Sequence, residues 1–179
     1  MKNKGVLWIA ETAIFIALIV VAQMTTSAFS TLITGSLVNL ILIVSVMMCG
    51  LSSGIVVALV SPILAKLFGI GPHEFLIPFI MLGNLVLILI WNAMGHKKFL
   101  VNRYITRIVT IIAAAGLKCL TLYVGIVLVA LPFLLNLPAE KEAVISATFS
   151  LPQFFTALIG GALAFCILPL IEKARNKNA

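Results

Sequence analysis

Acidic residues are scarce in this sequence of 179 residues: there are five, and charged residues of both signs make up only 9% of the chain. Hydrophobic residues make up 63%. A soluble domain is about one quarter charged, and a globule of this size could not bury so much apolar side chain, because small domains keep a large surface-to-volume ratio. The composition therefore excludes a water-soluble enzyme, a disordered protein and a nucleic-acid-binding domain, and it indicates an integral membrane protein.

Motifs for metal, redox or nucleotide chemistry are also missing. The three cysteines lie in separate apolar stretches without CxxC spacing, the two histidines are far apart, and no GxxxxGK[ST] sequence occurs. We interpret the cysteines as small buried hydrophobes, and we expect no metal site and no cofactor bound by this chain. Five scattered acids also make a membrane enzyme that acts on lipid or prenyl substrates the weakest functional alternative.

Long apolar runs are what the chain has in abundance. A membrane-spanning helix needs about 20 mostly apolar residues, and helices are the default in lipid because the backbone must satisfy its own hydrogen bonds there. The sequence predicts an all-α bundle of six transmembrane helices in a single domain, residues 1–179. The six predicted spans are residues 6–24, 32–49, 53–70, 75–94, 105–135 and 145–171. A very short junction at residues 50–54 predicts a tight hairpin.

The basic residues predict the orientation of the bundle, because cytosolic loops carry an excess of lysine and arginine. Nine of the 12 basic residues lie near the two termini or in the loop after the fourth span. Only Lys66 and Lys141 fall on the other side. We therefore expect both termini in the cytosol, in the plasma membrane of a bacterial-type cell, and the net charge of +7 needs no nucleic-acid partner.

Lys118 is the charged residue that does not suit a lipid-facing position. An ionisable side chain inside a span is costly unless it is paired or faces a cavity, and a rise of about 1.5 Å per residue from Arg107 places Lys118 about 16 Å deep. Asn39, Asn84 and Gln153 reach a similar depth from the outer ends of their helices. Two interpretations stay open: these side chains form a ligand-binding cluster, or they make interhelical hydrogen bonds that hold the bundle together.

Three further residues are candidates for the same outer pocket. Glu74 lies in an outer loop that could close over a ligand, whereas Tyr123 and Phe154 lie in the outer halves of the fifth and sixth spans. Aromatic rings at such positions also occur in the interfacial belt of membrane proteins. Tyr123 and Phe154 could therefore either line the pocket or belong to the interfacial belt, and both interpretations stay open.

Small residues form a stripe on each of two predicted spans, and small residues let another helix approach closely. The stripe on the first span consists of Ala10, Ala13 and Ala17. The stripe on the sixth span consists of Ala157, Gly160, Gly161 and Ala164. Each stripe could pack within the bundle or dock a partner protein.

This combination resembles a known family. Six helices in 179 residues with both termini inside, and the sequence AIFIA at residues 13–17, resemble the substrate-binding S component of energy-coupling factor (ECF) vitamin transporters. Residues 34–39, 50–54 and 69–84 resemble the broad group that includes pantothenate- and hydroxymethylpyrimidine-type members. The resemblance covers essentially the whole chain.

The resemblance implies a binding subunit without an ATPase of its own. Such a subunit binds a vitamin near the outer face and associates with a transmembrane coupling subunit and two ATPase subunits, which use the ATP. The family's AxxxA motif packs against the coupling subunit, and it corresponds here to Ala13 and Ala17.

The nature of the substrate follows from Lys118. A buried lysine without a nearby acid suits a ligand that carries a carboxylate, a phosphate or a strong carbonyl acceptor, so we favour a pantothenate-like ligand. A pyrimidine or pyridoxine-like compound, bound by the amides and stacked on an aromatic ring, stays open. A stand-alone secondary transporter or channel is the main alternative function, although no inverted repeat is evident.

Overall fold

The computed structural model describes residues 4–95, 103–135 and 137–177. All of the regular structure in these residues is helical, which confirms the all-α prediction. In chain order the elements are α1 (Lys4–Thr26), α2 (Thr31–Cys49), α3 (Leu51–Leu67), the 3-10 helix η1 (Glu74–Leu76), α4 (Ile77–Met94), α5 (Arg103–Leu122), the π-helix η2 (Tyr123–Ala130), α6 (Leu131–Leu134), α7 (Ala139–Thr148) and α8 (Leu151–Lys177).

The predicted hairpin between the second and third spans is present and very tight. Gly50 alone separates α2 from α3, and its φ of 88° lies in the region that glycine adopts without strain. The third span is shorter than the predicted 53–70, because α3 has 17 residues and ends at Leu67. Five other helical stretches among the described residues are long and apolar enough to cross a membrane.

A Schellman turn ends α3. Gly69 has a φ of 72°, its N–H donates to the Lys66 carbonyl, and the N–H of Ile70 donates to the Ala65 carbonyl. These two bonds satisfy carbonyls that the end of a helix would leave unpaired. The turn folds residues 70–72 back along the end of α3, where an added Cβ on Gly71 would lie 2.6 Å from the Lys66 nitrogen.

The fifth and sixth predicted spans are not the uninterrupted α-helices that the apolar runs suggested. The fifth changes from α-helix to π-helix at Tyr123, where the hydrogen-bond ladder lengthens to five residues, as in the bond from the Leu131 N–H to the Ile126 carbonyl. The sixth is broken between α7 and α8, and α7 occupies most of residues 136–144, which connect the predicted fifth and sixth spans. Asn136 itself lies outside the described residues.

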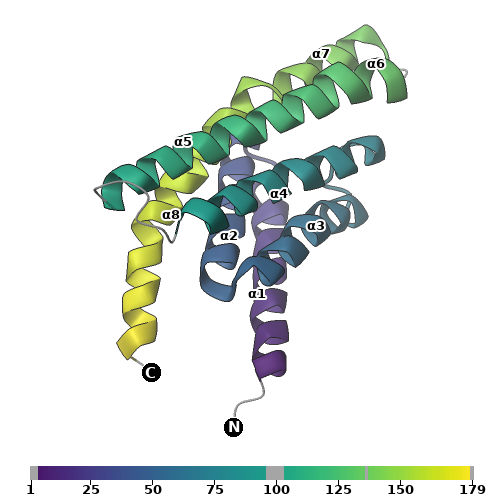
Figure 1. Ribbon diagram of the computed structural model, residues 1–179. Helices are drawn as coiled ribbons and strands as arrows, with labels where there is room; N and C mark the ends of the chain where they lie inside the picture. The colour runs from purple at the N-terminus through teal and green to yellow at the C-terminus, as the bar shows by residue number, and fades with distance from the viewer. Residues whose placement is uncertain (1–3, 96–102, 136, 178–179) are drawn as a thin grey trace.

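The two chain ends lie at the same end of the molecule. Figure 1 shows α1 and the C-terminal part of α8 running down to that end, while α6 and α7 project together at the far side. Lys2, Lys97 and Lys98, three of the basic residues that predict the cytosolic side, lie outside the described residues. The cytosolic location of the termini stays a prediction.

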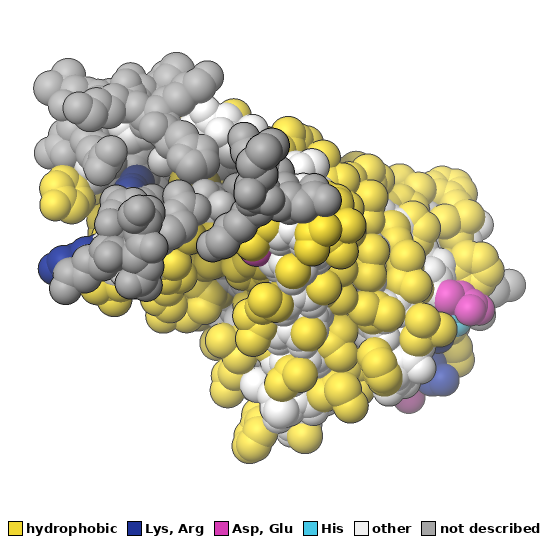
Figure 2. All heavy atoms as spheres, turned by 90° about the horizontal axis from the view of Figure 1, so that it is seen from below, with side chains coloured by type: hydrophobic (Ala, Val, Ile, Leu, Met, Phe, Trp, Pro, Cys, Tyr) yellow, Lys and Arg dark blue, Asp and Glu magenta, His cyan; other side chains and the backbone are white. Residues whose placement is uncertain are grey.

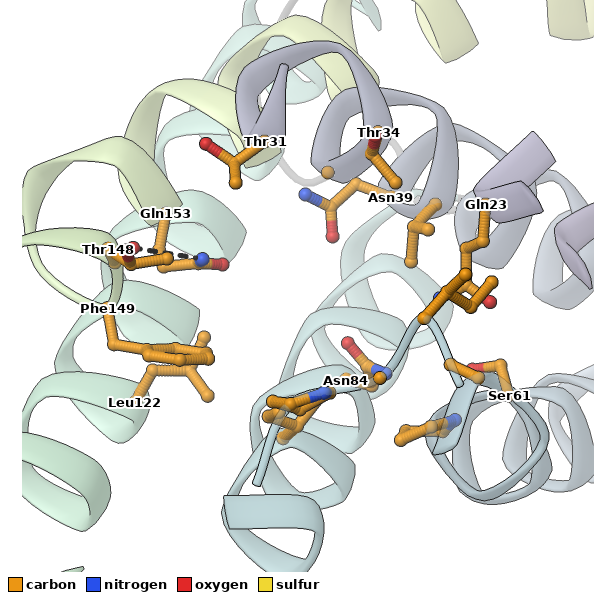
Figure 3. A pocket seen from close by; sticks show the side chains of 18 of the residues that line it. Gln23, Thr31, Thr34, Asn39, Ser61, Asn84, Leu122, Thr148, Phe149 and Gln153 are labelled. Atoms are coloured by element: carbon orange, nitrogen blue, oxygen red, sulfur yellow. Dashed lines mark hydrogen bonds between the residues drawn. The ribbon is translucent and has the colours of Figure 1, made fainter. Parts of the chain in front are cut away.

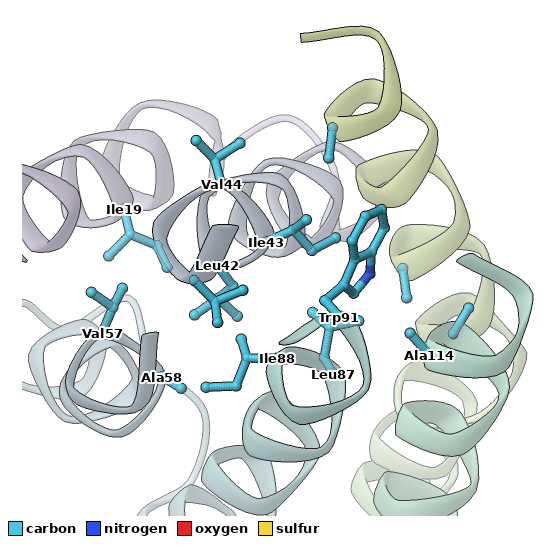
Figure 4. Packing of buried hydrophobic residues seen from close by; sticks show 14 of the residues in the cluster. Ile19, Leu42, Ile43, Val44, Val57, Ala58, Leu87, Ile88, Trp91 and Ala114 are labelled. Atoms are coloured by element: carbon cyan, nitrogen blue, oxygen red, sulfur yellow. The ribbon is translucent and has the colours of Figure 1, made fainter. Parts of the chain in front are cut away.

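Two apolar clusters hold the helices together. The larger cluster joins Ile19 of α1, Leu42 of α2, Val57 of α3 and Ile88 of α4, with Trp91 filling the space toward α8 (Figure 4). The smaller cluster joins η1, α4, α5, η2 and α6 around buried residues such as Leu122. Outside, apolar side chains cover most of the described surface in Figure 2, and the charged side chains seen there lie mainly toward its two ends, as expected of a surface in lipid.

Candidate ligand-binding cavity

A cavity of about 330 Å³ opens where the two apolar clusters meet, at the end of α1 opposite the chain termini. It is walled by α1 to α5, by residues 70–72 and by the junction of α7 and α8. Its polar lining residues are Gln23, Thr31, Thr34, Asn39, Ser61, Asn84, Lys118, Thr148 and Gln153. None of the described residues that line it is acidic, and Lys118 is the one lysine or arginine among them.

The Lys118 ammonium joins three helices. From α5, its Nζ donates to the Asn39 Oδ1 of α2 at 2.5 Å and to the Asn84 Oδ1 of α4 at 2.8 Å. All three side chains are buried, Lys118 being only 3% exposed. Counting residues from the ends of the apolar runs predicted that these three polar groups lie at a similar depth. The structure shows that they are in direct contact.

Pro62 fixes the orientation of the Asn84 amide. A proline inside a helix has no N–H for the carbonyl four residues earlier, and that carbonyl in α3 belongs to Ala58. The Asn84 Nδ2 donates to the Ala58 carbonyl at 3.4 Å. With its nitrogen held on α3, Asn84 presents its oxygen to Lys118.

Thr156 fixes the orientation of the Asn39 amide in a similar way. The Thr156 hydroxyl of α8 donates to the Gln153 carbonyl at 3.0 Å, so its oxygen accepts from the Asn39 Nδ2 at 3.2 Å. Asn39 thus also turns its oxygen toward Lys118. The two amides form a preset acceptor pair for one ammonium, each held from behind by another helix.

Gln153 lies at the break between α7 and α8. Its Nε2 donates to the Thr148 carbonyl at 3.2 Å, which satisfies a group that the end of α7 leaves unpaired (Figure 3). Phe149 is the C-cap residue that follows α7, and Pro152 lies in the first turn of α8, where its missing N–H costs nothing. The break thus places Thr148, Phe149 and Gln153 in the cavity wall.

Three predicted site residues do not line this cavity. Glu74 is exposed in η1. Tyr123 and Phe154 instead line a separate, mainly apolar hollow between α5 and the start of α8, and Tyr123 is 39% exposed. The ring that does line the polar cavity is that of Phe149.

Comparison with known protein families identifies the family of this chain. The family model described as "ECF transporter, substrate-specific component" matches residues 8–172. The chain belongs to this family. A search of curated proteins and a search of solved structures found no match. Members of the family are substrate-binding subunits of membrane transporters that work with a coupling subunit and ATPase subunits, and they are not enzymes.

The two small-residue stripes of this S component have different environments. On α8, Ala157, Gly160, Gly161 and Ala164 are buried, and an added Cβ on Gly160 would lie 2.7 Å from the Asn39 Cβ of α2. On α1, by contrast, Ala10, Ala13 and Ala17 are all exposed. The α8 stripe therefore packs within the bundle, whereas the α1 stripe faces outward.

Sequence reasoning missed several polar residues of the cavity. Gln23, Thr34 and Ser61 line it, and Thr156 lies behind Asn39. Each lies in or beside an apolar run, where a single polar residue is a weak signal because membrane helices often carry serine and threonine bonded to their own backbone. The angular position of each residue around its helix decides whether it reaches the cavity.

Proposed function

We propose that this S component captures a small water-soluble vitamin or precursor that carries a carboxylate, with pantothenate as the favoured example, at the extracellular side of the plasma membrane. The coupling subunit and two ATPases then drive its uptake, and ATP is used by those partners. The observation that carries this proposal is the buried ammonium of Lys118 in a cavity whose described lining contains no acid.

The hydrogen bonds of Lys118 leave room for a ligand. An ammonium has three N–H donors, and Asn39 and Asn84 accept two of them. The amide oxygens stabilise the positive charge without neutralising it. A ligand carboxylate would accept the third N–H and balance the charge, which is favourable in a site of low dielectric constant.

The shape of the cavity supports a small ligand without a large aromatic ring. Its volume of about 330 Å³ lies at the low end of the roughly 300–1,000 Å³ found for small-molecule pockets. Phe149 is the one aromatic residue among its lining residues, so a pyrimidine could not be stacked between two rings from the described part of the chain. This favours the carboxylate over the pyrimidine alternative.

The location of the cavity supports capture from outside. The cavity lies at the end of the bundle opposite the chain termini. If the concentration of basic residues near the termini marks the cytosolic side, the cavity faces the extracellular side.

The experiment compares two ligands that differ in charge. The purified protein is titrated with pantothenate and with pantothenol, in which a hydroxymethyl group replaces the carboxylate. We expect the wild type to bind pantothenate about 10- to 100-fold more tightly, because a hydrogen bond to a charged group contributes about 1.5–3 kcal/mol. Lys118→Met removes the charge at similar length and should bind both compounds with nearly equal affinity.

A Lys118→Met protein that still prefers pantothenate would show that the lysine does not bind the carboxylate. Hydroxymethylpyrimidine and pyridoxine in the same panel test the other substrate class. Uptake by proteoliposomes that contain this chain alone, without ATP, would instead favour the stand-alone transporter.

A further inference from the structure

The hydroxyl of Ser61 behaves differently from other serine hydroxyls in these helices. Ser36 and Ser45 donate to carbonyls of their own helix, at 2.7 and 2.8 Å. Ser61 is equally buried, at 1% exposed, yet its Oγ has no hydrogen-bond partner among the described residues. It lies in the wall of the cavity (Figure 3).

Gln23 of α1 supplies a second unpartnered atom to the same cavity. Its side-chain oxygen Oε1 is buried and has no partner among the residues that the structure describes. Helices α1 and α3 contact each other, and Figure 3 shows Gln23 and Ser61 on one side of the cavity, across from Thr148, Phe149 and Gln153. Buried polar atoms in native proteins are rarely left without a hydrogen bond, so we expect a bound molecule to supply a hydrogen-bond partner for each of these atoms.

The position of Ser61 relates this pair to the ammonium. The Asn84 amide is held on the Ala58 carbonyl, and Ser61 lies three residues further along α3, a rise of about 4.5 Å. This direction leads toward the Schellman turn that ends α3, beside residues 70–72 of the cavity wall. Ser61 is therefore displaced from the Lys118 group toward this turn, and Gln23 lies in the last turn of α1, also in the cavity wall.

From this geometry we propose that Ser61 and Gln23 form a second polar subsite, which binds a hydroxyl group of the ligand. The Gln23 oxygen can only accept a hydrogen bond, whereas the Ser61 hydroxyl can also donate one. A ligand hydroxyl satisfies both, because it donates to Gln23 and accepts from Ser61. The inference rests on the proposed function and sharpens it: the ligand is a small monoanion that enters carboxylate first and carries a hydroxyl group at its other end.

The test uses a ligand that lacks the hydroxyl groups. N-(3,3-dimethylbutanoyl)-β-alanine is pantothenate with both hydroxyls replaced by hydrogen, and it keeps the carboxylate and the amide. We expect Ser61→Ala and Gln23→Leu each to lower pantothenate affinity about 3- to 10-fold, because each removes one hydrogen bond. Neither change should alter the affinity for the analogue more than about 2-fold.

Ser45→Ala is the matched control, because it removes an equally buried hydroxyl that donates to its own helix, and it should change neither affinity. The subsite is wrong if Ser61→Ala and Gln23→Leu bind pantothenate as the wild type does, or lose affinity for both compounds equally. That result leaves the Lys118 assignment standing. A wild type that binds no carboxylate in the panel overturns both proposals. If Ser61→Ala does not fold, the half-buried Gln23 carries the test alone.

Discussion

At the scale of single residues, the site depends on side chains that fix one another's orientation. Pro62 withholds an N–H from the Ala58 carbonyl, Asn84 donates to that carbonyl, and its oxygen is thereby turned to Lys118. The proline thus helps to build the candidate binding site although it offers no hydrogen bond to a ligand. Such second-layer support is what holds a polar site in one geometry.

Replacing Pro62 should therefore separate stability from binding. Pro62→Ala restores an N–H that bonds the Ala58 carbonyl within α3, which makes that carbonyl a poorer acceptor for Asn84. We expect the melting temperature to stay unchanged or to rise, since proline is unfavourable inside a helix. We expect pantothenate affinity, measured by titration calorimetry, to fall about 3- to 10-fold, the loss of about one hydrogen bond.

Pro169→Ala is the control for this change. Pro169 also lies inside a helix, α8, but it is exposed and remote from the cavity lining. Its replacement should not alter affinity. Unchanged affinity in Pro62→Ala would mean that Asn84 keeps its orientation without the proline.

The sequence allowed part of this cluster to be predicted. Counting residues from the ends of apolar runs gives the depth of a side chain, and Lys118, Asn39 and Asn84 share a depth. The count does not give the angular position of a side chain around its helix. Tyr123 and Phe154 lie at a suitable depth but face a different hollow, and Ser61 and Gln23 reach the cavity through angles that an isolated sequence does not reveal.

At the scale of the elements, glycine sets how closely α2 and α8 approach. An added Cβ on Gly160 would lie 2.7 Å from both the Asn39 Cβ and the Ser36 carbonyl oxygen, and 2.9 Å from the Leu40 nitrogen. Backbone atoms cannot move aside as a flexible side chain can. The close approach also brings Thr156 within reach of Asn39, so the packing of these two helices helps to build the site.

Two glycine substitutions should therefore differ in their effect on stability. Gly160→Ala should lower the melting temperature by several degrees, because overpacking costs about 1–3 kcal/mol, and it should weaken ligand binding by moving Asn39. Gly116→Ala, in α5, meets no atom within 4 Å and should leave the melting temperature unchanged or raise it slightly. Equal melting temperatures for the two variants would contradict the tight contact between α2 and α8.

Sequence patterns did not predict the helix breaks that lie inside the apolar runs. Apolar length predicted one helix at residues 145–171, but the chain changes direction between Thr148 and Leu151, where Gln153 satisfies a freed carbonyl. The π-helix of η2 is likewise hidden in a uniformly apolar stretch. Hydrophobicity reports that a segment lies in lipid, and local hydrogen bonds decide how that segment is folded there.

At the scale of the whole molecule, one face of α1 is left uncovered by the rest of the chain. Ala10, Ala13 and Ala17 are exposed there, whereas the opposite side of α1 buries Ile19 against the core. Exposed apolar side chains are expected in lipid, but a row of alanines lets another helix approach closely. In a family of transporter subunits, we propose that this face docks the coupling subunit.

The docking proposal predicts that binding and assembly can be separated by one substitution. Ala13→Leu places a larger side chain on this face, where it points away from the core and the cavity. Ligand affinity and melting temperature should therefore match the wild type, while co-purification with the coupling and ATPase subunits, and ATP-driven uptake, should fall at least about 10-fold, because a misfit of even 1.4 kcal/mol at an interface has that effect. Ala143→Leu, at an exposed position of α7, is the control and should assemble normally.

If Ala13→Leu assembles as well as this control, the contact with the coupling subunit lies elsewhere. If Ala13→Leu loses ligand binding, α1 shapes the cavity rather than the interface.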